Sequence, residues 1–398
     1  MTAFPAPIWR QITTDAPYAW HIREGIAESP VHRAADLAVA DAKLNAFLDA
    51  LRIGLVSGLS IDDSVLAFED PGSVFITATL GFTLGRDDLL DRACEALAER
   101  GDYPGEFHAA VSWLGLRSEQ VSRLVDHANG EVRQAAVATF ASAPDEHWFA
   151  DTDPAVHVRM LDWIGHRRSH AHGHVVRRAY AQEPSDGDEA AQRLRFAALR
   201  AGVLLGDNDA YVALSSELSN EDPNLLQTVE LLVRFGAPTY RSMLLDTLSS
   251  DDFSPRVRAH AYGASGLPAH VPQLLALMED PEYARVAGQA FCTITGADIT
   301  ADDLDASVEP DWEDTVNVGG DPQYSDVEEL LAMPHTESVV AWWASRAPDV
   351  EPQERYLVGG RLTPEHLSAV LASGTQTQRK SAAYEMAALD RDAPVPKL

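Results

Sequence analysis

A two-residue signal for helix starts, aspartate followed by proline, recurs along this chain. Aspartate suits the N-cap position because its carboxylate accepts hydrogen bonds from the free backbone N–H groups of the first turn. Proline suits the first helical position because its missing N–H would have no partner there. The pairs are Asp70-Pro71, Asp153-Pro154, Asp222-Pro223 and Asp280-Pro281, and Ser254-Pro255 is the serine version. So many marked starts predict a fold built mainly from helices.

Apolar residues that follow helix starts recur every three or four positions, which indicates amphipathic helices. After Asp188 the apolar positions are Ala191, Leu194, Ala198, Ala201 and Leu205. No segment shows the sustained alternation that is typical of strands. The segment from Gly72 to Leu84 is the most ambiguous, because it contains residues that favour strands locally. It is shorter than the ~18 residues that a membrane span needs, so a buried helix is the favoured interpretation. We therefore predict an all-α fold.

The spacing of the helix starts predicts a repeat architecture. If each repeat is a pair of helices, the second helix of successive pairs is expected to begin near Pro71, Pro104, Glu131, Pro154, Asp188, Asp222, Pro255 and Pro281. Intervals of roughly 23 to 34 residues leave room for two helices and two turns, and such a pair must stack on neighbours to bury its apolar face. We expect an α-α superhelix, a HEAT/armadillo-like solenoid of stacked helix pairs. Its expected parts are an N-terminal helical cap (1–60), HEAT-like repeats (61–296), an acidic loop (297–332) and a C-terminal helical segment (333–398).

Several of these helices contain the pattern valine–arginine–x–x–alanine. Val132-Arg133 precedes Ala136, and Val257-Arg258 precedes Ala261. This pattern resembles the second helix of HEAT repeats, in which valine and alanine pack inward. The resemblance implies that the arginine contacts an aspartate of an adjacent unit.

The regions outside the repeats differ in composition. Residues 32–55 have the pattern of one long helix that would cap the solenoid. Residues 297–329 are rich in aspartate and glutamate, and form either an exposed loop or a surface that recognises a basic partner. The last segment has the pattern of two or three helices, with a start at Thr363-Pro364, a stop at Gly374 and a final helix from Gln378 to Leu389.

The charge of the chain bears on its partners. The sequence has 61 acidic and 31 basic residues, which gives a net charge of −30. Such a charge opposes binding to a phosphate backbone, so we expect no nucleic-acid partner. It suits a basic protein partner, or it only keeps the chain in solution. No membrane segment or secretory leader is recognisable, and the two cysteines, Cys94 and Cys292, have the surroundings of core residues. We expect a cytoplasmic protein.

Tryptophans and their acidic neighbours are the candidate protein-binding residues. Trp342 and Trp343 are adjacent, so both cannot face one side of a helix and one is expected to be partly exposed. Exposed aromatic residues are typical interface anchors. The alternative is that both pack between C-terminal helices. The acidic segment adds Asp311, Trp312, Glu313 and Asp314 to the candidates.

Motifs for metal binding or catalysis are weak or missing. His166 and His170 have a spacing that places two imidazoles on one helix face, and His172 and His174 follow, but the neighbouring arginines oppose a metal ion. We find no G-x-S-x-G elbow, P-loop or dinucleotide fingerprint. We therefore expect no metal, no cofactor and no enzymatic activity.

Several C-terminal segments resemble a known family. They are Ala284 to Phe291 with Ile294 to Asp298, Trp342-Trp343, Arg355 to Gly359, and Gly374 to Arg379. Together they are similar to an uncharacterised bacterial family of HEAT-like proteins that is typically encoded beside type VI secretion genes. The match covers roughly residues 281–388 and is loose before them. Family members often continue into a further tail, whereas this sequence stops at Leu398.

The resemblance implies a non-catalytic protein-binding module of type VI secretion. It would act as an adaptor or chaperone for an effector, or as an immunity protein against a toxin, with an effector or spike-tip component as partner. Two alternatives stay open. One is a structural or assembly accessory of the apparatus, and the other is an enzyme on a HEAT-like scaffold.

Overall fold

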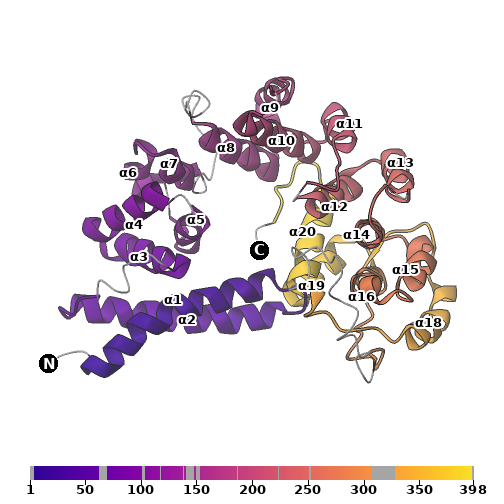
Figure 1. Cartoon of the computed structure of the whole chain (residues 1–398), viewed down its shortest axis with the longest axis horizontal. Helices are drawn as coiled ribbons and strands as arrows, with labels where there is room; N and C mark the ends of the chain where they lie inside the picture. The colour runs from indigo at the N-terminus through magenta and orange to yellow at the C-terminus, as the bar shows by residue number, and fades with distance from the viewer. Residues whose placement is uncertain are drawn as a thin grey trace. The chain divides into compact units, whose positions relative to one another are not determined.

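The computed structural model describes residues 4–61, 70–100, 104–116, 118–137, 139, 148, 153–185, 187–222, 224–250, 252–306 and 328–396. The described residues are mostly helical, which confirms the all-α class (Figure 1). Contacts divide the chain into two compact units. Unit 1 comprises Met1–Ala27, Ala35–Gly165 and Ser169–Ala201, and unit 2 comprises Glu28–Ala34, His166–Arg168 and Gly202–Leu398. The expected boundaries at residues 60, 296 and 332 stay predictions.

The helices up to the end of unit 1 are α1 (Ala6–Glu28), α2 (Ala34–Val56), α3 (Pro71–Leu84), α4 (Asp87–Arg100), α5 (Pro104–Trp113), α6 (Ser122–Val125), α7 (Gly130–Val137), α8 (Pro154–Arg167), α9 (Gly173–Tyr180) and α10 (Glu189–Leu204), with 3-10 turns at Ser118–Val121 and His170–His172. The ambiguous segment is the helix α3, and it is buried along most of its length. It packs against α4 and α5. The indole of Trp20 in α1 stacks on Phe75 in α3, with ring centroids 3.6 Å apart.

Helix α1 was not predicted. Its sequence contains Pro17, and proline in a helix interior removes a backbone hydrogen bond. Tertiary packing compensates for this, because Pro17 is buried and its carbonyl lies close to Gly72 at the start of α3. A Cβ atom at Gly72 would come within 2.5 Å of that carbonyl oxygen, so only glycine permits the approach.

Most of the predicted helix starts are confirmed. The carboxylates of Asp70, Asp153 and Asp280 accept hydrogen bonds from N–H groups two residues later, at 2.7, 3.0 and 3.0 Å. The hydroxyl of Ser254 caps α14 in the same role. The start at Asp222 is displaced, because α12 begins at Leu225 and Asp222 accepts from the N–H of Asn224 at 2.8 Å.

Unit 2 contains α11 (Asn208–Ser216), α12 (Leu225–Phe235), α13 (Pro238–Leu248), α14 (Pro255–Ser265), α15 (Val271–Leu277), α16 (Pro281–Thr295), α18 (Thr336–Ala344), α19 (Pro364–Ser373) and α20 (Gln376–Leu389), with 3-10 turns at Pro268–His270 and Ala347–Asp349. Helices α12, α14 and α16 contact one another in chain order, while α13 packs on α12 and α14, and α15 packs on α14 and α16 (Figure 1).

The valine–arginine–alanine pattern behaves as predicted at its apolar positions. Val132, Ala136 and Ala261 are fully buried, and Val257 is nearly so. Arg133 lies 3.7 Å from the carboxylate of Asp153, the cap of α8, which confirms the expected arginine–aspartate contact within unit 1. Arg258 differs, because its buried Nε has no hydrogen-bond partner in the described part of the chain.

Two or three helices were predicted for the C-terminal segment, and it contains three, α18, α19 and α20, together with a hairpin that was not predicted. Strands β1 (Tyr356–Leu357) and β2 (Gly360–Arg361) pair antiparallel. The turn residues bond to α16, with the N–H of Val358 donating to the Thr293 carbonyl at 2.7 Å. Leu357 then packs with α19 and α20 in a small core. The hairpin was missed because two-residue strands leave no period in the sequence.

The acidic segment is only partly described. Residues 297–306 follow α16 as turns and end in an antiparallel bridge between Asp305 and Pro334. Within the described ranges, no helix has both the length and the apolar character needed to cross a membrane.

Candidate functional site

The two adjacent tryptophans, Trp342 and Trp343, lie near the end of α18. Both indoles meet the ring of Phe291 in α16 edge to face, with centroids 5.7 and 6.1 Å away. Both are half-buried. The expectation that both cannot face one side of the helix does not hold, because both reach the ring of Phe291, and both keep a solvent-exposed part.

A hollow of about 230 Å³ lies beside these indoles. The guanidinium of Arg346 lies 3.8 Å from the ring centroid of Trp342, in cation–π geometry. The remaining lining residues are Pro268, Ile294, Thr295, Asp349, Val350, Tyr356 and Gly359. The buried Nε1 of Trp342 has no hydrogen-bond acceptor among the described residues. A buried donor without an acceptor is unfavourable.

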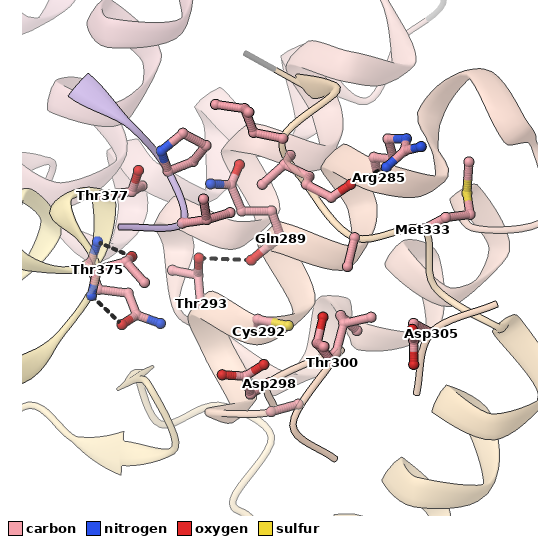
Figure 2. A pocket seen from close by; sticks show the side chains of 18 of the residues that line it. Arg285, Gln289, Cys292, Thr293, Asp298, Thr300, Asp305, Met333, Thr375 and Thr377 are labelled. Carbon is pink, nitrogen blue, oxygen red and sulfur yellow. Dashed lines mark hydrogen bonds between the residues drawn. The ribbon is translucent and has the colours of Figure 1, made fainter. Parts of the chain in front are cut away.

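A larger pocket of about 590 Å³ is lined in part by α16 (Figure 2). We call it the α16 pocket. Arg285, Gln289, Cys292 and Thr293 line it, with the i, i+4, i+7, i+8 spacing of one helix face. Phe291 and the hollow beside the tryptophans occupy the other face, so α16 contributes to two distinct surfaces of unit 2.

The N-terminus of α20 forms a second wall of the α16 pocket. Thr375 and Gln378 make a reciprocal capping box, in which each side chain accepts from the other residue's backbone N–H. An extended segment at residues 30–33 lies against this end of the helix through a bridge between Arg33 and Thr375. The N–H of Gln376 donates to the carbonyl of His32 at 2.9 Å.

The third wall comes from the two ends of the acidic segment. Ala306 donates its N–H to Met333 at 2.9 Å, and His335 donates to Leu304 at 2.7 Å. Two apolar side chains at the rim, Val31 and Leu330, remain 41% and 52% exposed. The lining of the pocket thus combines polar side chains with partly exposed apolar ones.

The charged groups of the α16 pocket fall into two sets. Arg33 lies 3.0 Å from the carboxylate of Asp298, and Arg285 donates to the carbonyl of Leu331, so both guanidiniums have protein partners. The carboxylates of Asp305 and Glu329 have neither an ion-pair nor a hydrogen-bond partner within the described ranges. The charge left over at this pocket is negative.

Some neutral polar groups of the pocket also have no hydrogen-bond partner among the described residues. Figure 2 shows Gln289 near the centre of the lining, where its backbone carbonyl accepts from the hydroxyl of Thr293. The side-chain amide of Gln289 and the hydroxyls of Thr300 and Thr377 have no partner in the described part of the chain. They can donate to a ligand and accept from it.

The cysteines are poor nucleophiles. Burial raises the pKa of the Cys292 thiol to about 12 and that of Cys94 to about 11. Since the thiolate is the reactive form, neither side chain is activated at neutral pH. The α16 pocket therefore offers hydrogen-bonding and charged groups without an activated thiol.

The histidine cluster is spread over two elements and a turn. The Nδ1 of His172 lies 2.8 Å from the hydroxyl of Ser169, and that of His174 lies 3.2 Å from the carbonyl of Ala171. His166 accepts a backbone hydrogen bond from Val395 through its carbonyl. Across the described ranges, no three His, Cys, Asp or Glu side chains are grouped so that they hold a metal ion.

The remaining candidates, Asp311, Trp312, Glu313 and Asp314, lie outside the described residues. The structure therefore places only Trp342 and Trp343 of the predicted binding residues.

Comparisons of this chain with protein-family models, curated proteins and solved structures found no match. The resemblance to a HEAT-like family associated with type VI secretion stays a prediction.

Sequence reasoning missed the α16 pocket, although its parts carried a signal. Arg285, Gln289, Asp298, Thr375 and Thr377 all belong to the segments on which the family resemblance rests. The structure brings these distant segments to one place, which spacing along the chain did not reveal.

Proposed function

We propose that this chain is a HEAT-like α-α superhelix that acts as a non-catalytic protein-binding module. The order of contacts in unit 2 supports the repeat architecture, since α12, α14 and α16 follow one another with α13 and α15 packed beside them. The Arg133–Asp153 pair supports it in unit 1. A helix-pair scaffold of this kind presents extended surfaces to partners.

One observation carries the binding function: Trp342 and Trp343 both remain partly exposed and line one hollow together with Arg346. Tryptophan and arginine are enriched among residues that dominate binding energy, and the Arg346 guanidinium lies over the Trp342 ring. A partner that covers this surface gains aromatic contact area.

The resemblance supports a role in type VI secretion. We propose that the protein works in the cytoplasm as an effector adaptor or chaperone, or as an immunity protein, and that its partner is an effector or a spike-tip component. The net charge of −30 suits a basic toxin domain. A structural accessory of the apparatus is the second candidate, and the same exposed tryptophans would suit it. An enzyme has less support, because the thiols that we find in the described residues have raised pKa values.

The test is capture of partners from the native host with secretion active, followed by mass spectrometry. The tagged full chain should enrich one effector or spike-tip protein in near-equal amount. Trp343→Ala should reduce that recovery about tenfold or more, as expected for an interface anchor. Trp343→Phe, which keeps a ring against Phe291, controls for folding, and Met243→Ala removes an apolar side chain that is 61% exposed elsewhere.

The outcomes separate the hypotheses. Co-expression of the captured toxin with this chain distinguishes immunity, in which cells survive, from loading, in which toxicity persists. Enrichment of sheath or baseplate components instead would favour the structural accessory. If no component of the secretion apparatus is captured, the type VI role is wrong, and equal recovery with Trp343→Ala would exclude the tryptophan surface.

A further inference from the structure

We propose that the α16 pocket binds an extended segment of a partner protein, in which an arginine or lysine stands next to an apolar residue. This inference rests on the proposed protein-binding function. It assigns a second site, on the face of α16 opposite Phe291 and the tryptophans.

The neutral polar side chains of the pocket match a peptide backbone. The amide of Gln289 has a donor and an acceptor, and neither has a partner within the described residues. An extended backbone presents N–H and C=O groups with the same chemistry, so one carboxamide can bond to both. The free hydroxyls of Thr300 and Thr377 add contacts to further backbone groups.

The rim of the pocket accounts for the apolar residue. Val31 and Leu330 line the pocket and are 41% and 52% exposed. Met333 and Pro30 line it beside them. In an extended segment successive side chains point to opposite sides, so one apolar side chain can cover this rim while its neighbour turns toward the acidic groups.

The charges of the pocket specify a basic side chain. Arg33 and Arg285 are held by Asp298 and by the Leu331 carbonyl. Asp305 and Glu329 keep their charge without a protein cation among the described residues. The net charge of −30 makes the approach of a basic segment favourable at long range and that of an acidic segment unfavourable.

The test uses a displayed library of random 12-residue peptides, selected on the immobilised full chain. Synthetic copies of the enriched peptides are then titrated by fluorescence anisotropy. We expect the enriched sequences to share an arginine or lysine next to Leu, Ile, Val or Met. Gln289→Ala should weaken binding by about tenfold, because backbone hydrogen bonds are lost.

Separate variants test the attraction between the pocket carboxylates and the basic side chain of the peptide. The double change Asp305→Asn with Glu329→Gln should weaken binding several-fold and flatten its dependence on salt, since screened charge attraction is removed. Glu279→Gln, at an exposed position that lines neither the α16 pocket nor the hollow beside the tryptophans, is the control and should leave both the affinity and its salt dependence unchanged. Circular dichroism of each variant reports whether it is folded.

Each result decides a different claim. Enriched peptides that bind Gln289→Ala as tightly as the parent, or that are acidic, overturn the assignment of the pocket. Peptides that lose affinity only with Trp343→Ala overturn it too, but leave the protein-binding function standing. If no peptide is enriched while capture from the host finds a partner, the pocket assignment alone fails. If both find nothing, the binding function fails as well.

Discussion

The guanidinium of Arg234 in α12 lies 2.7 Å from the carboxylate of Glu385 in α20, and both side chains are almost fully withdrawn from solvent, at 3% and 2% exposed. Arg234 also bonds to Glu230 at 3.0 Å and to the hydroxyl of Ser381 at 2.7 Å. Arg355, which precedes the hairpin, donates to the same Glu385. This network joins the last helix and the hairpin to α12 within unit 2.

Removing Glu385 should strongly destabilise unit 2. Glu385→Ala removes one of the two carboxylates that pair with the buried charge of Arg234, and breaking a buried pair from one side costs about 3–5 kcal/mol. We expect a loss of that size in the free energy of unfolding by urea. Glu279→Ala, at an exposed position, should change it by less than about 0.5 kcal/mol. Equal effects of the two changes would show that the network contributes nothing to stability.

A buried histidine should make unit 1 sensitive to mild acid. The pKa of His108 is lowered from 6.5 to about 4, mainly by burial and secondly by the charge of Arg159, although its ring bonds to the Glu131 carbonyl. The unfolded chain takes up this proton at a higher pH than the folded chain. The contribution of neutral His108 to stability is therefore fully present above pH 6.5 and is lost as the pH falls from 6.5 to about 4. The loss should reach about 3 kcal/mol.

The measurement is the midpoint of unfolding in urea as a function of pH. His108→Gln should flatten the curve between pH 6.5 and 4, whereas His174→Gln, at an exposed position of the same unit, should leave its slope unchanged. A slope that survives His108→Gln would assign the acid sensitivity to other groups.

Two glycines with left-handed backbones test how closely the hairpin packs on α16. Gly296 has φ 74°, and a Cβ atom there would lie 2.7 Å from the Val358 carbonyl carbon. Gly85 has φ 62° but opens into free space. Both changes to alanine carry the conformational cost of roughly 1 kcal/mol, and Gly296→Ala should cost clearly more because the hairpin must shift. Thermal unfolding of both variants measures the difference, and equal losses would mean that the contact yields without cost.

Local signals predicted the secondary structure well where a helix start had its own cap. Asp280 and Thr363 each bond to the first turn of the helix that they were expected to begin. The same reasoning failed at α1, where Pro17 hid a helix that packing against α3 maintains. It failed also at the hairpin, whose strands are held by contacts with α16 rather than by their own pattern.

The sequence by itself determined the helical class, most of the helix starts and the inward-facing positions, because caps and apolar periodicity act over a few residues. Only the tertiary structure decided the two surfaces of α16. Arg33, Gln289, Asp298 and Thr377 line one pocket although they stand far apart along the chain, and Trp342 and Trp343 meet one phenylalanine. Such groupings depend on how whole helices pack, which no local pattern encodes.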